Sequence, residues 1–79
     1  MNKNELKNAL KNEGVSNELY SLEGGVPSEK LCLDFENGKW IVYYSERGCR
    51  TGIMSFVMEN DACKYIYDQI KAIVNGQLR

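Results

Sequence analysis

Apolar residues recur at helical spacing at the start of the chain, where we predict a helix over residues 2–13. Asn2 or Asn4 can cap its first turn, and Gly14 follows at the position where helices commonly end. The apolar stripe of this segment consists of Leu6, Ala9 and Leu10. Because the stripe is narrow, we expect a peripheral helix that is stabilised by modest burial.

A second helix is predicted over residues 60–74, and its apolar stripe is continuous. The members of that stripe are Ala62, Cys63, Ile66, Ile70, Ile73 and Val74. Asn60 is expected to be the N-cap, with the negative charge of Asp61 in the first turn favoured by the helix dipole. Asn75–Gly76 is expected to end the helix, and residues 77–79 are expected to fray.

Between the helices the pattern changes to that of strands, which we place at about 18–22, 30–36, 39–45 and 53–58. Asn37–Gly38 separates the two central strands by two residues that tolerate positive φ, which predicts a type I′ hairpin. The last strand is apolar on both sides, so its alternation does not orient it. We expect a longer connection before that strand, and we expect Phe56 to point inward.

The hairpin register follows from the two-residue turn, which pairs Phe35 with Trp40 and Leu33 with Val42. The face predicted to form the core carries Leu31, Leu33, Phe35, Trp40, Val42 and Tyr44. We expect Trp40 to be buried against the second helix. The other face carries Cys32, Asp34, Glu36, Lys39, Ile41 and Tyr43. It is only half polar, so a part of it is either covered or available to a partner.

These elements predict a single α+β domain over residues 1–79. It has an N-terminal helix, an antiparallel meander of three to four strands and a C-terminal helix packed on one sheet face. The chain has 79 residues, of which 43% are hydrophobic, and this content is too high for a disordered chain. The formal net charge is -1, so no strong overall field attracts nucleic acid or anionic lipid.

The N-terminus is polar and no apolar run is long enough for a membrane span, so we expect a cytoplasmic protein without membrane contact. The three cysteines, Cys32, Cys49 and Cys63, are too widely spaced for a zinc signature and too few for a disulfide framework. We therefore expect reduced thiols, two of them packed as small hydrophobic side chains and Cys49 exposed.

Catalytic patterns are scarce, and the chain has no histidine to act as a base or a metal ligand. Asp34 and Glu36 lie two apart on one strand face, where a carboxylate pair can act as acid and base. Cys49 lies close to Arg47 and Arg50, which would lower the pKa of a thiol. The carboxylate pair is more typical of an ordinary solvated strand face, and the cysteine has no base to partner it. We therefore expect the protein to be non-enzymatic and to hold no cofactor and no metal.

A nucleic-acid-binding module is the second alternative, alongside an uncharacterised regulatory or interaction domain. Lys39, Arg47, Arg50 and exposed tyrosines would form a local basic and aromatic patch for a single strand. The slight overall acidity and the lack of any motif typical of RNA-binding domains argue against this function.

Three stretches of the chain are distinctive, namely LYSLEGGVPSEKLCL at 19–33, GKWIVYYSERG at 38–48 and SFVMENDACKYIY at 55–67. Together they resemble small bacterial immunity proteins, which protect a cell from polymorphic, contact-dependent toxins. The string WIVYYSERG is the most specific part. The resemblance implies a non-enzymatic cytoplasmic binder that occludes a cognate protein toxin, and it implies no particular contact residues.

For the contact surface we rely on physical reasoning alone, which favours the outer hairpin face and the loop that follows it. The expected partner-binding residues are Asp34, Glu36, Ile41, Tyr43, Glu46, Arg47 and Arg50. Ile41 and Tyr43 are expected to form the apolar centre, with the carboxylates opposite basic residues of a toxin. The sequence leaves open the identity and activity of the toxin and the choice between a monomer and a homodimer.

Overall fold

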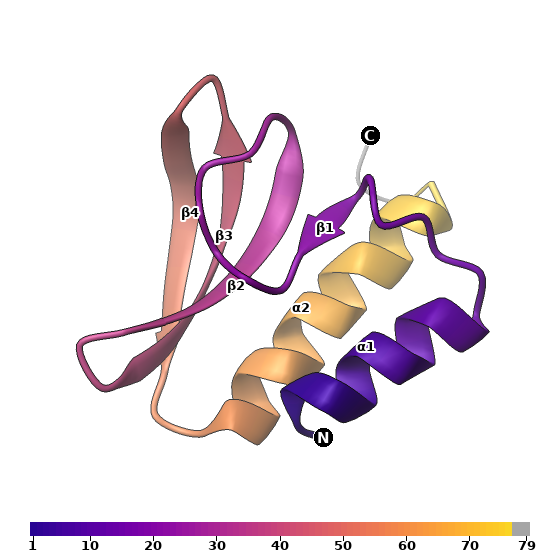
Figure 1. The fold of residues 1–79 in the computed structure, drawn as a ribbon, viewed down its shortest axis with the longest axis horizontal. Coiled ribbons are helices and arrows are strands. Elements are labelled where there is room, and N and C mark those ends of the chain that lie inside the picture. The colour runs from indigo at the N-terminus through magenta and orange to yellow at the C-terminus, as the bar shows by residue number, and fades with distance from the viewer. Residues whose placement is uncertain (77–79) are drawn as a thin grey trace.

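The computed structural model describes residues 1–76, and the expected fraying of residues 77–79 lies outside that range. The elements in chain order are α1 (Lys3–Asn12), β1 (Tyr20–Ser21), β2 (Lys30–Glu36), β3 (Lys39–Glu46), β4 (Cys49–Phe56) and α2 (Glu59–Val74). One face of the sheet is covered by α2, and α1 packs alongside α2 (Figure 1). The α+β fold class is thereby confirmed.

The sheet is mixed rather than wholly antiparallel. Its strand order is β1-β2-β3-β4, with antiparallel pairing except between β1 and β2, which are parallel. The expected antiparallel meander is therefore wrong at β1, and the expected strand 18–22 is reduced to two residues. Parallel neighbours must start at the same end of the sheet, so residues 22–29 have to cross back before β2 begins.

The central hairpin has the predicted register. Phe35 pairs with Trp40 and Leu33 pairs with Val42. The turn residues Asn37 and Gly38 have φ values of 54° and 78°, as a type I′ turn requires. The side-chain alternation of both strands is thus set by the turn and the pattern together.

The predicted long connection before the last strand is wrong. A second tight turn at Arg47–Gly48 follows β3 directly, and β4 begins at Cys49. Gly52 lies inside β4, where the pairing with β3 shifts register between Val42 and Tyr44. This glycine reads as a loop residue in the sequence, but in the structure it occupies a bulge.

Both ends of α1 follow the sequence closely. The Asn2 side chain accepts a hydrogen bond from the backbone N–H of Glu5, whose side chain in turn accepts one from the backbone of Asn2, forming a capping box. Past the helix end, the backbone N–H of Val15 donates to the carbonyl of Leu10 at 3.0 Å.

The start of α2 differs from the prediction by one residue. Helix α2 begins at Glu59 with Met58 at the N-cap, and no side chain caps it. Asn60 is therefore not the cap, and its Oδ1 instead accepts a hydrogen bond from the amino group of Met1. The helix ends before Asn75–Gly76, as predicted.

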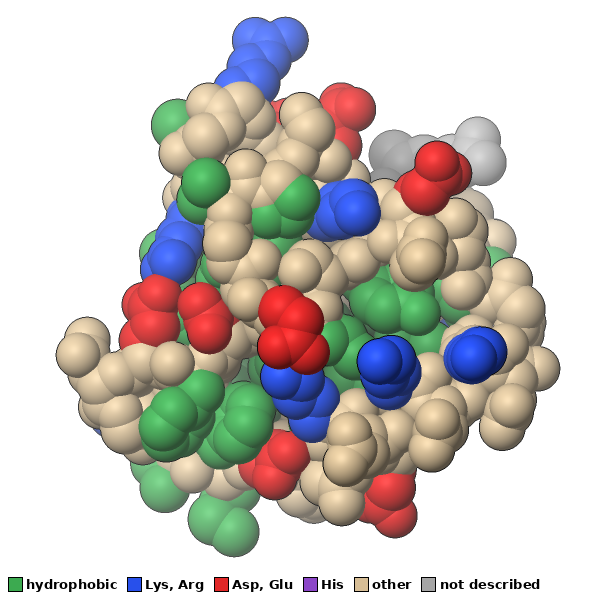
Figure 2. All heavy atoms as spheres, viewed as in Figure 1, with side chains coloured by type: hydrophobic (Ala, Val, Ile, Leu, Met, Phe, Trp, Pro, Cys, Tyr) green, Lys and Arg blue, Asp and Glu red, His purple; other side chains and the backbone are tan. Residues whose placement is uncertain are grey.

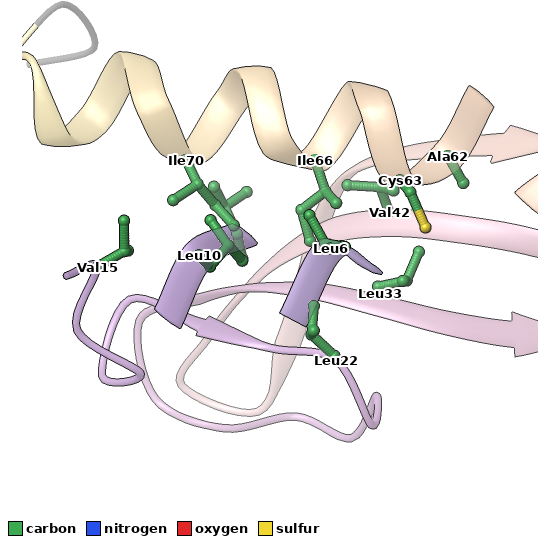
Figure 3. Packing of buried hydrophobic residues seen from close by; sticks show 11 residues of the cluster. Leu6, Leu10, Val15, Leu22, Leu33, Val42, Ala62, Cys63, Ile66 and Ile70 are labelled. Carbon is green, nitrogen blue, oxygen red and sulfur yellow. The ribbon is translucent and has the colours of Figure 1, made fainter. Parts of the chain in front are cut away.

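The main core lies between the sheet and the two helices (Figure 3). Its buried members are Leu6, Leu10, Val15, Leu22, Leu31, Leu33, Val42, Ala62, Cys63, Ile66 and Ile70. Although α1 packs on α2 rather than on the sheet, Leu6 and Leu10 have no exposed surface at all. The narrow stripe of α1 is thus completely buried.

The end of the central hairpin is buried only in part. Phe35 is 53% exposed, so the expectation that it belongs to the core is wrong. Figure 1 shows the reason, because the β2–β3 turn projects past both helices. Trp40 is half-buried rather than fully buried and packs against the main core. Its ring also packs on that of Phe35, with 4.9 Å between centroids. Phe56 does face α2, where its ring lies 5.3 Å from that of Tyr65.

We predict that Leu33→Ala destabilises the protein by about 2–5 kcal/mol, because Leu33 is fully buried and truncation leaves a cavity. Phe35→Ala, two residues along the same face, is the control and should cost about 1 kcal/mol, chiefly its contact with Trp40. Urea unfolding followed by far-UV circular dichroism measures both. Equal losses would contradict the placement of Phe35 outside the core.

Candidate functional site

The outer face of the hairpin, where the sequence places the partner surface, is closed. Cys32, Ile41 and Tyr43 form a second buried cluster in which no member is more than 8% exposed. The expectation that Ile41 and Tyr43 form an exposed apolar centre is therefore wrong. Residues 22–29, which cross between β1 and β2, make hydrogen bonds to this face.

Two hydrogen bonds attach the crossing loop to β3. The Tyr43 hydroxyl donates to the carbonyl of Gly25 at 2.6 Å, and the Ser45 hydroxyl donates to the carbonyl of Pro27 at 2.7 Å. Burial raises the pKa of Tyr43 to about 12, so the hydroxyl stays protonated and remains a donor at neutral pH. Both side chains come from one face of β3 and satisfy carbonyls that would otherwise need water.

Gly24 is the point where the loop approaches the sheet most closely. It is buried, and its φ is 72°. A Cβ atom built there would lie 2.3 Å from a carboxylate oxygen of Asp34, a distance that real atoms do not adopt. Glycine therefore suits this position for two reasons: its φ is in the left-handed region, and any side chain here would displace the Asp34 carboxylate.

The charged residues expected at the interface partly neutralise each other. Arg50 donates two hydrogen bonds to the Glu36 carboxylate, at 3.1 and 2.7 Å, and its guanidinium lies 4.5 Å from the ring centre of Tyr43. These hydrogen bonds hold the pKa of Glu36 below its ordinary value. A carboxyl with a lowered pKa is a poor proton donor at neutral pH, which weakens the interpretation of Asp34 and Glu36 as a catalytic pair.

The other expected residues lie at a different end of the sheet. Glu46 and Arg47 are exposed at the β3–β4 turn, and Cys49 is exposed beside them. The structure therefore brings Asp34, Glu36, Arg50 and the buried Ile41 and Tyr43 to one face, but it places Glu46 and Arg47 at the tip of the second hairpin.

The predicted burial of Cys32 and Cys63 and exposure of Cys49 are confirmed.

Exposed apolar side chains occur instead along β4 and at the end of the sheet, a surface that the sequence analysis missed. They are Phe35, Ile53, Met54, Val57 and Met58, and we call them the edge surface. Figure 2 shows hydrophobic side chains gathered at the lower left, over the end of the sheet where the β2–β3 turn and the β4–α2 connection lie. The sequence feature that could have indicated this surface is the last predicted strand, residues 53–58, which is apolar on both sides.

The position of β4 in the sheet makes this surface unusual. The strand is at the edge, so one side of its backbone has no partner strand among residues 1–76. Arg50 and the bulge at Gly52 disrupt its first half, which is a common protection of edge strands. The run Ile53–Met58 contains no charged residue, and its apolar members other than Phe56 are 44% to 75% exposed.

Other features of residues 1–76 give no indication of a catalytic centre at the sheet. A hollow of about 180 Å³ between β3, β4 and α2 is smaller than typical ligand pockets. No His, Cys, Asp or Glu side chains of the described range gather in groups of three or more as metal ligands do. Within the same range, no helix combines the length and apolar character that crossing a membrane requires.

Comparisons with protein-family models, with curated proteins and with solved structures each found no match. The resemblance to immunity proteins therefore depends on the sequence strings alone. It stays a prediction, and the geometry above is the independent information on function.

We predict that Tyr43→Phe lowers the free energy of unfolding by about 1 kcal/mol, because it deletes the hydroxyl that donates to Gly25. The matched control is Tyr44→Phe, since the Tyr44 hydroxyl forms no hydrogen bond within residues 1–76. Chemical denaturation measures both variants. Indistinguishable stabilities would show that the loop is not held by this bond.

The ion pair between Glu36 and Arg50 predicts a specific acid response. Because the pKa of Glu36 is lowered in the folded protein, its contribution to stability is present above the ordinary value of 4.5 and is lost as the pH falls through the folded pKa. Glu36→Gln should therefore flatten the decline in stability below about pH 4.5. Glu46→Gln, at an exposed position, should leave the decline unchanged, and identical profiles for all three proteins would contradict the prediction.

Proposed function

We propose that the chain is a non-enzymatic module that binds a protein partner through the edge surface. The observation that carries the proposal is the charge-free and mostly exposed run Ile53–Met58, which covers the second half of the edge strand β4 and the two residues after it. Proteins normally protect such an edge because it pairs with other chains. The second half of β4 lacks the protection that Arg50 and the bulge give to the first half, and an apolar edge of this kind is expected of a surface that a partner covers.

The composition of the edge surface supports a protein ligand. Phe35, Met54 and Met58 belong to residue types that are enriched at the centres of interfaces. A standard interface takes about 800 Å² from each partner. The accessible surface of the chain is 5102 Å², so the edge surface and the residues around it would supply about one sixth of the total.

The backbone of β4 adds directionality to this contact. An extended segment of a partner can add to an open edge and form main-chain hydrogen bonds, while alternate side chains contact its two faces. The part of β4 after the bulge that pairs regularly with β3, residues 54–56, offers this pairing. The adjoining Val57 and Met58 would then be covered by the body of the partner.

The resemblance to immunity proteins suggests the class of partner, a cognate toxin in the cytoplasm. Toxins that act on nucleic acid carry basic residues at their active sites. Asp61, exposed in the first turn of α2 three residues after Met58, is available to such a residue, whereas Glu36 is already paired with Arg50. The engagement of Arg50 also weakens the alternative of a nucleic-acid-binding module.

The test uses the toxin domain encoded beside the gene for this chain, titrated by calorimetry. We expect Met54→Glu and Val57→Glu each to weaken binding at least about tenfold, because each places an unpaired charge inside the interface. Val74→Glu is the matched control, because Val74 is similarly exposed at the opposite end of α2. Its binding should be unchanged.

Three outcomes would contradict the proposal. The toxin domain does not bind the wild-type chain, all three variants bind it equally, or the edge surface is occupied by a second copy. The last is detected by light scattering as a wild-type dimer that becomes a monomer in Val57→Glu.

A further inference from the structure

A cavity of about 660 Å³ lies between α1 and the segment that contains β1, at the margin of the main core, whose members Val15 and Leu22 form part of its lining. Its apolar lining includes Val15, Tyr20 and Leu22, and its polar lining includes Lys7, Lys11 and Lys30. In Figure 2 a hollow to the right of centre has a hydrophobic floor, with lysine or arginine side chains around its rim. This volume is within the range of small-molecule sites.

Positive charge is concentrated at this cavity although the chain as a whole is slightly acidic. Lys7 and Lys11 lie one turn apart on α1, both are exposed, and neither forms an ion pair within residues 1–76. Like charges at this spacing destabilise a helix by a few tenths of a kcal/mol. Lys30 approaches from the start of β2, and its ammonium group makes one long contact, 3.4 Å, to the carbonyl of Asn17.

The one carboxylate in the cavity lining does not neutralise these lysines. Glu23 lies 2.9 Å from the ammonium group of Lys3, and its side chain is 79% exposed. Its charge is therefore balanced at the rim by a lysine that does not line the cavity. Lys7, Lys11 and Lys30 remain available to a ligand.

We propose that this cavity binds a phosphorylated small molecule. The phosphate lies among Lys7, Lys11 and Lys30, and the organic part packs on Tyr20 and Leu22. A phosphate carries nearly two negative charges at neutral pH and accepts several hydrogen bonds at once, which suits ammonium groups approaching from two elements. This site is separate from the edge surface and does not depend on the proposed protein partner.

An extended acidic peptide fits the observations less well. Such a peptide would need positive charges spread along a groove, whereas these lysines border one cavity from α1 and from β2. The half-buried ring of Tyr20 offers a flat apolar surface to an aromatic or sugar group next to the phosphate.

The test is an NMR titration of the ¹⁵N-labelled full chain with adenosine 5′-monophosphate, phenyl phosphate, inorganic phosphate and adenosine. We expect the two organic phosphates to shift the amide signals of residues 7–30 that line the cavity, inorganic phosphate to shift them more weakly, and adenosine to leave them unchanged. Lys7→Gln/Lys11→Gln should weaken the binding at least about tenfold.

Lys39→Gln/Lys64→Gln is the matched control, because it removes the same charge from exposed positions outside the cavity. It should bind as the wild type does. Lys7→Gln/Lys11→Gln should also melt no lower than the wild type, because it relieves like-charge repulsion, and this excludes misfolding as the cause of lost binding.

The proposal is overturned if none of the phosphates shifts these signals at millimolar concentration, or if both double variants lose binding equally. A poly-glutamate peptide that binds at the cavity while the phosphates do not would assign the lysines to a protein ligand instead.

Discussion

The rest of the structure depends on the coverage of the outer sheet face by the crossing loop, which the hydrogen bond from the Tyr43 hydroxyl to the Gly25 carbonyl helps to hold in place. A sheet with helices on one side only would leave Cys32, Ile41 and Tyr43 exposed on the other. Residues 1–76 contain no third helix to cover them. The segment between β1 and β2 serves instead, and the parallel pairing of β1 requires that segment to cross back. Ser45 and the missing side chain of Gly24 allow it to lie close.

Closing the outer face determines where a partner can bind. With Ile41 and Tyr43 buried, the large exposed apolar side chains lie mainly on β4 and at the hairpin end, and α1 presents its lysines to a separate cavity. On the outer face, Arg50 and Glu36 are occupied with each other in an ion pair. The edge surface proposed to bind a protein and the cavity proposed to bind an anion are therefore separate parts of one small fold.

The sequence predicted those parts that depend on local rules. Asn37–Gly38 and strict alternation determine the hairpin register, and Asn2 determines the start of α1. The remaining features depend on tertiary contacts. Coverage of the outer face depends on the path of the crossing loop, and exposure of Phe35 depends on how far the hairpin extends past α2. A glycine such as Gly52 is typical of a loop as well as of a bulge within a strand. The sequence alone therefore could not show that β4 begins before Gly52.

The most direct test of the closed outer face is the reactivity of the three cysteines toward a thiol reagent, resolved by mass spectrometry. Cys49 is exposed, Cys63 lies in the main core, and Cys32 lies under the crossing loop. Burial raises the pKa of Cys32 and of Cys63, which slows both thiols further. The account predicts rapid modification of Cys49, with Cys32 and Cys63 protected in the native state. Modification of Cys32 as fast as that of Cys49 would contradict it.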